Sequence, residues 1–318
     1  MSRILITGGT GFIGSYLSAK LIDDGHFLTV AHRSAMATGF PDSVRTVAIE
    51  NIGPRTDWRQ ALEGCEVVVH LGAQVPSHGA QIADYDAINN IGTASLVEQS
   101  IGARIKRFIF LSSVSAVVES ATRGEVSEKT RNSSSLTAYG QSKREAERHV
   151  TSFARDGRVG ISIRPPLVYA FNAKGRWATL QRLAASRLPL PFGMVHNRRS
   201  LIAVENLVDA LAATISVSEM RDVSGVYFVA DNKGVSISDI VGWLREGMGL
   251  PRLLLPLPVA TLRGILRVAG FDNTAQGILG DLMIDSTLFR TVFDWTPRLD
   301  SKEAIKKSGQ QYRLGRRS

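Results

Sequence analysis

The chain has 318 residues, of which 44% are hydrophobic and 21% charged, an ordinary composition for a globular protein of one large or two closely packed domains. A single cysteine, Cys65, excludes an internal disulfide and favours a reducing compartment, so we expect a cytoplasmic protein. The formal net charge of +9 favours anionic partners, but no basic surface interleaved with aromatic residues and no nucleic-acid motif is present, so we expect no nucleic-acid partner.

The predicted elements begin with a strand over residues 3–8, "RILITG", with no signal segment before it. "FIGSYLSAKLIDDG" has helical spacing, and "FLTVAH" is a second strand. Further helices are predicted at "DWRQALEG", "DAINNIGTASLVEQSIGA" and "AYGQSKREAERHVTSFARDG", and further strands at "EVVVHLGA", "RFIFLSS" and "VGISIRPPLVY". This alternation predicts an α/β fold with a Rossmann-type, doubly wound parallel sheet. No apolar run approaches the roughly 18 residues of a membrane-spanning helix, so we expect no stable membrane insertion.

The regular alternation weakens after Pro165. "AVENLVDALAATISV" predicts a helix and "GVYFVAD" a last clear strand, whereas the chain from about Val235 mixes short helices with proline-containing loops. We therefore expect a dinucleotide-binding domain from residues 1–165 plus about 201–230. A smaller substrate-binding domain, from about 166–200 and 231–318, is expected over the carboxyl ends of the strands.

A glycine loop, "TGGTGFIG", joins the first strand to the first helix and contains Gly8, Gly11 and Gly14. Glycine permits a tight turn and a close approach of the backbone to a pyrophosphate, and the following helix N-terminus offers free N–H groups. Glycines also occur in loops for purely conformational reasons. The position between an apolar strand and a helix nevertheless favours dinucleotide binding.

Tyr139 and Lys143 lie four residues apart on a predicted helix, so both project from one face. An ammonium beside a phenol lowers the phenol's pKa, and such a tyrosine can exchange a proton with an alcohol or carbonyl oxygen. Ser112, Ser113 and Ser115 follow an earlier predicted strand, where a hydroxyl could bind the reacting oxygen. A surface pair and turn serines would explain each feature alone. The chain contains all three features in this order, the glycine loop, the strand-end serine and the Tyr-x-x-x-Lys pair, and this combination favours a catalytic set.

These segments resemble the extended short-chain dehydrogenase/reductase (NAD-dependent epimerase/dehydratase) family. The likeness runs over nearly the whole chain, through "TGGTGFIG", "GCEVVVHLGA", "INNIGT", "FLSS", "YGQSKREAE", "IRPPLVY", "NRRSLIAVENLVDAL" and "FDWTP". The chain is most similar to the bacterial branch of UDP-glucose 4-epimerase-like proteins and UDP-sugar 4-ketoreductases, which act on precursors of surface polysaccharides such as lipopolysaccharide. The resemblance implies a UDP-sugar substrate and no metal.

The resemblance also assigns roles to residues. It implies that Tyr139 is the catalytic acid/base and that Lys143 lowers the pKa of Tyr139 and contacts the ribose. It also implies that Ser113 holds the substrate oxygen. Arg199 would bind the nucleotide diphosphate, and Arg176 stands where the family often has a substrate-contacting asparagine. The implied cofactor contacts are Gly8, Gly11, Phe12, Ile13, Gly14, Asn51, Leu71 and Lys143. Ala170 departs from the family's glycine in "VYG", which leaves the identity of the sugar open.

The end of the second strand, "TVAHRSA", has His32 and Arg33 where an acid would bind the ribose of NAD. His32 and Arg33, with Ser34 beside them, favour NADP(H), although Arg33 could also stack on adenine or face solvent, and NAD(H) stays open. NADP(H) favours reduction of a UDP-4-keto-6-deoxy-N-acetylhexose over C4 epimerisation with tightly bound NAD. A non-catalytic dinucleotide sensor is a third alternative. A homodimer through "TASLVEQSIGA" and "YGQSKREAERHVTSFA" is also left open.

Overall fold

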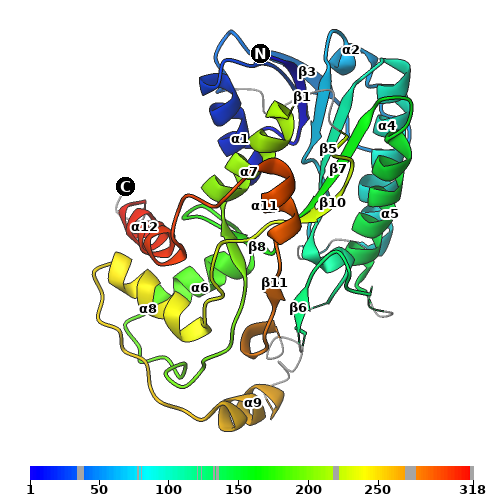
Figure 1. The fold of residues 1–318 in the computed structure, drawn as a ribbon. Helices are drawn as coiled ribbons and strands as arrows, with labels where there is room; N and C mark the ends of the chain where they lie inside the picture. Colours follow the sequence, from blue (N-terminus) through cyan, green and yellow to red (C-terminus); the bar gives the residue numbers. More distant parts are fainter. Residues whose placement is uncertain are drawn as a thin grey trace.

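The computed structural model describes residues 1–33, 39–76, 79, 81–119, 121–122, 124–131, 133, 136–217, 222–268 and 277–315 (Figure 1). Its centre is a seven-stranded, all-parallel sheet in the order β10-β7-β5-β4-β1-β2-β3, as in a doubly wound Rossmann-type sheet, so the predicted α/β fold is confirmed. The strands are β1 (Arg3–Thr7), β2 (Phe27–Arg33), β3 (Arg45–Ile49), β4 (Val67–His70), β5 (Arg107–Leu111), β7 (Val159–Arg164) and β10 (Gly225–Phe228). The sequence analysis did not predict β3.

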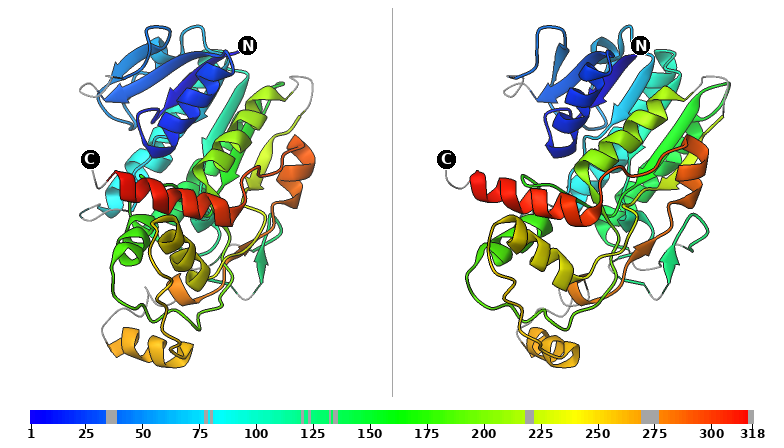
Figure 2. Two further views of the ribbon diagram at one scale, coloured as in Figure 1. Left: turned by 90° about the vertical axis from the view of Figure 1, so that its left-hand side faces the viewer. Right: turned by 60° about the vertical axis from the view of Figure 1, so that its left-hand side comes forward.

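Helices cover both faces of the sheet because successive strand residues point to opposite sides. Ile4 and Ile6 pack in one core with residues of α1 (Phe12–Asp23) and α7 (Val204–Ser216). Leu5 lies between them in sequence but packs in the opposite core, with α4 (Gly92–Gly102) and α5 (Ala138–Phe153). Figures 1 and 2 show these helices as two layers around the strands. Cys65 is buried in the second core.

Two predicted elements differ in the structure. "VGISIRPPLVY" forms two strands in different sheets, because the prolines at 165 and 166 have no N–H groups to continue the ladder. The second of these, β8 (Leu167–Tyr169), pairs with β9 (Leu201–Ala203). The predicted helix around "DAINNIG" begins as a π-helix, Tyr85–Ile91, after the single turn α3 (Ile82–Asp84).

Four helices and their connecting loops form a second body beneath the sheet, which we call the smaller lobe. They pack around buried side chains such as Trp177, Leu244 and Ile305 (Figure 2). The helices are α6 (Arg176–Ala185), α8 (Ile237–Gly247), α9 (Val259–Val268) and α12 (Ser301–Leu314). The precise residue division into two domains stays a prediction. A separate observation concerns membranes. Within the described part of the chain, no helix has both the length and the apolar character needed to cross a membrane.

Short elements connect the two bodies. β6 (Glu125–Val126) pairs in parallel with β11 (Met283–Ile284), a strand beyond the last one predicted from sequence. α11 (Thr287–Phe293) then packs Phe289 and Phe293 against Tyr227 of β10 (Figure 1). Short helical elements also occur at α2 (Arg59–Leu62) and, as a 3-10 turn, at Val114–Ala116.

Candidate active site

The glycine loop is packed too tightly to accept side chains. Gly8 has a φ of +70°, and a Cβ placed there would lie 2.8 Å from the backbone nitrogen of Gly72. A Cβ on Gly14 would lie 2.7 Å from the Cα of Gly9. Leu71, half-buried directly after β4, donates its N–H to the Thr7 carbonyl at 3.2 Å and so lies at the same edge of the sheet. Loop, helix start and the end of β4 thus form one close-packed backbone surface.

The start of α1 has the properties of an anion site. Gly11 caps the helix without a side-chain hydrogen bond, and the first turn contains no acidic residue. Phe12 and Ile13, the first two helical residues, are half-buried. The N–H groups and positive dipole end of this twelve-residue helix are therefore not satisfied by the helix's own side chains, which fits the pyrophosphate of a dinucleotide.

The residues at the end of β2 have different surroundings. His32 is buried, with Nδ1 3.1 Å from the Arg33 carbonyl oxygen, whereas the Arg33 side chain is exposed. Asn51 is exposed just beyond the neighbouring strand β3, and its Oδ1 accepts the Ile52 N–H at 3.0 Å. Ser34 lies outside the described residues. Of these two basic residues, which end the described part of this segment, Arg33 is the one exposed to a ligand, whereas His32 is buried in the strand end.

Ser113 and Tyr139 are brought together, as the sequence predicted. Ser113 follows the end of β5, and its Oγ accepts the Ser115 N–H at 3.1 Å. Its side chain also lies close enough to the Tyr139 phenol to lower the pKa of that group. Tyr139 lies in the first turn of α5, with the Tyr85 ring edge-on at 6.0 Å. Burial, with a smaller contribution from Tyr85, raises the pKa of Tyr139 to about 12, and the Ser113 hydrogen bond opposes that rise.

Lys143 lies one turn further along α5 but points elsewhere. Its buried ammonium donates to the Leu111 carbonyl at 2.8 Å and lies 4.5 Å from the centre of the Phe110 ring. Burial lowers the pKa of Lys143 to about 7, and the negative charge of Glu147 opposes this. The expectation that Lys143 lowers the pKa of Tyr139 toward neutrality is therefore wrong for the protein without ligands, because Leu111 holds the ammonium and burial dominates at the phenol.

A buried polar network behind Lys143 was missed by the sequence analysis. Glu147 accepts hydrogen bonds from Arg164 at 2.8 and 2.6 Å, one to each carboxylate oxygen, and from the Ser112 hydroxyl at 2.5 Å. This network ties α5 to the ends of β5 and β7 and explains why Ser112 faces away from Tyr139. Its sequence signal was the four-residue spacing of Tyr139, Lys143 and Glu147, which places all three on one helix face.

A second tie to α5 comes from the π-helix. The buried Asn89 side chain accepts the Gln74 N–H at 2.8 Å and donates to the Gln74 carbonyl and to Ser142 Oγ, each at 3.0 Å. Ser142 in turn donates to the Tyr139 carbonyl at 2.9 Å. The segment after β4 is thereby joined to the helix that carries the tyrosine.

Arg176 and Arg199 approach each other from α6 and the segment before β9. Burial first, and then the charge of Arg176, lower the pKa of Arg199 to about 10, against the opposing charge of Asp281. Arg199 donates to the Gly280 carbonyl at 2.8 Å, while Arg176 is exposed. Two adjacent guanidinium groups repel each other until a dianion lies between them, so the pair suits a diphosphate.

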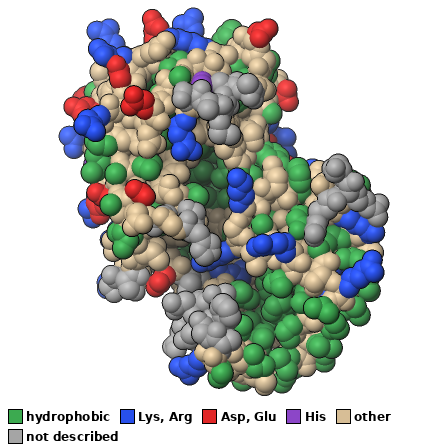
Figure 3. Space-filling model, turned by 180° about the vertical axis from the view of Figure 1, so that it is seen from behind, with side chains coloured by type: hydrophobic (Ala, Val, Ile, Leu, Met, Phe, Trp, Pro, Cys, Tyr) green, Lys and Arg blue, Asp and Glu red, His purple; other side chains and the backbone are tan. Residues whose placement is uncertain are grey.

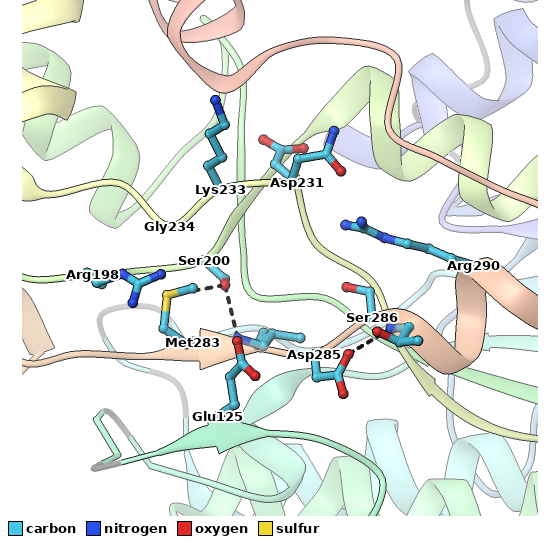
Figure 4. A pocket seen from close by; sticks show the side chains of 13 residues that line it. Glu125, Arg198, Ser200, Asp231, Lys233, Gly234, Met283, Asp285, Ser286 and Arg290 are labelled. Carbon is cyan, nitrogen blue, oxygen red and sulfur yellow. Dashed lines mark hydrogen bonds between the residues drawn. The ribbon is translucent and has the colours of Figure 1, made fainter.

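A separate cavity of about 560 Å³ lies on the other side of this segment (Figure 4). Arg198 and Ser200, the neighbours of Arg199, line it because alternate residues of an extended segment point to opposite sides. No residue predicted as a site residue lines this cavity. The other lining residues are Glu125, Asp231, Asn232, Lys233, Gly234, Met283, Ile284, Asp285, Ser286, Thr287 and Arg290.

No group of three or more His, Cys, Asp or Glu residues that could hold a metal occurs in the described parts of the chain.

The back of the molecule is hollowed between the sheet body and the smaller lobe, and Lys and Arg side chains lie along this hollow (Figure 3).

Comparisons with known proteins agree with this arrangement. Residues 4–230 match the model of the NAD dependent epimerase/dehydratase family. UDP-glucose 4-epimerase of Vibrio cholerae is 30% identical over 316 residues, covering 97% of this chain and 95% of its own length. In fold, the chain is similar to UDP-N-acetylglucosamine 4-epimerase of Bacillus cereus (TM-score 0.78, 21% identity, 98% of this chain and 100% of that chain). It is also similar to UDP-glucuronic acid 4-epimerase of Bacillus cereus in complex with NAD (TM-score 0.76, 19% identity, 99% and 100%). The chain therefore belongs to the NAD dependent epimerase/dehydratase family, enzymes of the extended short-chain dehydrogenase/reductase type.

Proposed function

We propose that the protein is an NAD-dependent UDP-sugar 4-epimerase acting on a UDP-hexose or UDP-N-acetylhexosamine. The observation that carries this proposal is a glycine loop and helix N-terminus that fit a dinucleotide, at the same edge of the sheet as Ser113 and Tyr139. The full-length similarity to UDP-glucose 4-epimerase of Vibrio cholerae supports the choice of epimerisation and of a UDP-sugar. NAD in the solved UDP-glucuronic acid 4-epimerase supports the cofactor.

Each residue would act as follows. The backbone N–H groups at Phe12 and Ile13 would bind the dinucleotide pyrophosphate, and Lys143 would contact the nicotinamide ribose. When bound, the nicotinamide supplies the hydride exchange at C4 of the sugar. Tyr139 would take the proton of the C4 hydroxyl and return it to the same oxygen after the sugar has presented its other face. Ser113 would donate a hydrogen bond to that oxygen and hold it within reach of the phenol.

The arginine pair would hold the far end of the substrate. Arg199 and Arg176 would bind the diphosphate, so that the sugar can turn while the nucleotide stays in place. Binding at this remote point supplies positioning energy without contacting the reacting carbon. Removal of water around the half-buried phenol strengthens its interaction with the bound cofactor's charge, which is expected to bring the Tyr139 pKa down from about 12.

The test is to identify the nucleotide in the purified enzyme and to assay epimerisation. We expect NAD to be released on denaturation, and UDP-glucose or UDP-N-acetylglucosamine to be converted to the C4 epimer without added cofactor. Chromatography would identify the nucleotide released on denaturation, and ion-pair chromatography would measure the epimer formed. An enzyme that carries no NAD and epimerises neither sugar nucleotide contradicts the proposal.

NADPH-dependent reduction of a UDP-4-keto-6-deoxy-N-acetylhexose is the second candidate, and Arg33 is the observation that favours it. The exposed guanidinium at the end of β2 can accept a 2′-phosphate, and no carboxylate stands at positions 32 or 33 to repel one. The family description and the NAD-containing neighbour place NAD ahead of the NADP(H) preference inferred from sequence. Consumption of NADPH with such a ketone, lost in Arg33→Ser, would reverse that order.

The remaining expectations stay predictions. A homodimer through α4 and α5 and a cytoplasmic location would both suit an enzyme of nucleotide-sugar metabolism. Size-exclusion chromatography with light scattering tests the first, and cell fractionation tests the second. The sensor alternative predicts dinucleotide binding without any turnover.

A further inference from the structure

Large hydrophobic side chains are exposed together at one end of the smaller lobe. Val268 is 92% exposed, Leu188 69%, Ile265 54% and Leu255 52%. We define the apolar patch as Leu188, Met194, Leu253, Leu255, Ile265 and Val268. Figure 3 shows hydrophobic side chains over much of the lower part of this lobe, with no acidic side chain visible there. Single exposed hydrophobic residues are ordinary, but a gathered set marks an interaction surface.

Buried hydrogen bonds hold the two loops of the patch in place. Backbone hydrogen bonds join the two loops at Leu190, whose N–H donates to Leu253 O at 3.1 Å and whose carbonyl accepts the Leu255 N–H at 2.8 Å. The buried guanidinium of Arg245 donates to the carbonyls of Leu253 and Leu188 at 2.7 and 2.6 Å. Because their backbones are fixed in this way, the exposed leucines are presented outward by ordered structure.

Helix α9 is amphipathic, and only part of its apolar face is buried. Leu262 is buried, and Val259 and Leu266 pack against the same core at helical spacing. Ile265 lies three residues after Leu262, on the flank of this face, and Val268 lies one turn beyond it. Both are exposed with respect to the described residues, so the packing of the lobe covers only part of the apolar face of α9.

Among the described residues nearest to the patch in the chain, the charges have one sign. Residues 173–203 and 247–268 contain nine Lys and Arg residues and no Asp or Glu. Arg187, Arg263 and Arg267 are exposed close to patch residues in the chain. A second copy docked symmetrically on this surface would bring arginines against arginines, which disfavours self-association. A negatively charged surface with an apolar layer beneath it matches both properties.

We infer that the apolar patch docks the protein on an anionic phospholipid bilayer. The patch side chains enter the boundary between headgroups and acyl chains, and Arg187, Arg263 and Arg267 bind the lipid phosphates. Docking of this kind is peripheral and reversible, and it does not depend on which reaction the active site carries out. It would place a sugar-nucleotide enzyme beside a membrane surface.

The test is co-sedimentation of the full chain with vesicles of phosphatidylcholine alone or mixed with phosphatidylglycerol. We expect binding to the anionic vesicles, weaker binding at high salt, and little binding to phosphatidylcholine. The triple variant Leu188→Ser, Ile265→Ser, Val268→Ser should bind anionic vesicles at least about tenfold more weakly than the wild type. The double variant Arg263→Gln, Arg267→Gln should lose at least as much binding. All changed side chains are exposed, so the thermal melting temperature should stay within a few degrees.

Matched variants on the sheet body serve as controls. Phe27→Ser, at a side chain 61% exposed, and Arg55→Gln with Arg148→Gln remove similar groups away from the patch and should leave vesicle binding unchanged. No binding to anionic vesicles, or binding that the triple variant leaves intact, overturns the inference. Loss of binding on removing only residues 316–318 would assign docking to Arg316 and Arg317 instead. Concentration-dependent dimers abolished by the triple variant, without vesicle binding, would assign the patch to a second copy.

Discussion

The two sides of the expected substrate site, the sheet side and the lobe side, differ in how their charged groups are arranged. On the sheet side, Lys143, Glu147 and Arg164 all have partners within the protein. On the lobe side, Arg176 and Arg199 bring two like charges together, and burial with this repulsion lowers the Arg199 pKa. The side assigned to chemistry pairs opposite charges within the fold, whereas the side assigned to recognition brings like charges near each other, which a bound anion would stabilise.

The largest expected effect is loss of turnover in Tyr139→Phe. Removing the phenol removes the proton acceptor and donor at C4, so kcat should fall about a thousandfold. The fold should persist, because the neighbouring Ser113–Ser115 bond remains. Steady-state epimerisation assays measure kcat, and a thermal melt measures whether the fold persists. Tyr85→Phe, whose ring contacts Tyr139, is the control and should keep most of the activity. Undiminished turnover in Tyr139→Phe would show that another group moves the proton.

Glu147→Gln should destabilise the sheet side by about 3 kcal/mol. The variant leaves the largely buried Arg164 guanidinium without a counter-charge and weakens the bond to Ser112. Urea unfolding followed by circular dichroism measures this change. Glu145→Gln removes a half-buried carboxylate that pairs with the exposed Arg148 on the same helix, and it should change stability by less than about 0.5 kcal/mol. Equal effects of the two substitutions would mean that the network is not a structural tie.

Arg199→Met should raise KM for the sugar nucleotide about ten- to a hundredfold, with a smaller change in kcat. The guanidinium contacts the diphosphate and not the reacting carbon, so ground state and transition state lose the same interaction. Arg176→Met should act in the same direction but more weakly, because its side chain is exposed. Arg198→Met is the matched control, since Arg198 lines the cavity on the other side. A kcat loss without a KM change would place Arg199 at the reaction centre.

The pH dependence of stability should show the buried lysine. The folded-state pKa of Lys143 is about 7, below its ordinary value of 10.5, so between these values the unfolded chain binds a proton that the folded chain does not. Stability therefore rises with pH in this window, by at most about 1.4 kcal/mol per pH unit. Urea unfolding of the ligand-free wild type at pH 7 and pH 9 should show this gain, and Lys143→Met should lack it. Identical pH slopes for both proteins would mean that the ammonium stays charged.

Local sequence signals predicted much of this molecule. The glycine loop could be predicted because only glycine adopts the φ of Gly8 and leaves room at Gly14. Helical spacing put Tyr139 and Lys143 on one face, and strand–helix alternation predicted the parallel sheet. Strand β3 was missed because its Arg45–Ile49 stretch is short and only partly buried.

Other features depend on where elements of distant sequence meet. Sequence spacing alone does not show that Ser112 turns to Glu147 while Ser113 turns to Tyr139, since that depends on how α5 crosses the end of β5. The direction of the Lys143 ammonium was also unpredictable, because its acceptor is a backbone carbonyl that every residue carries.

The sequence by itself determined the alternation of strands and helices in the first half of the chain, the tight glycine loop and the candidate reactive groups. These follow from side-chain periodicity and from the stereochemistry of single residues, which act locally. Only the tertiary structure decided the pKa values of Tyr139 and Lys143, the pairing of Arg176 with Arg199, and the exposure of the apolar patch. Burial and charge proximity are set by the packing of segments far apart in the chain, so no local pattern encodes them.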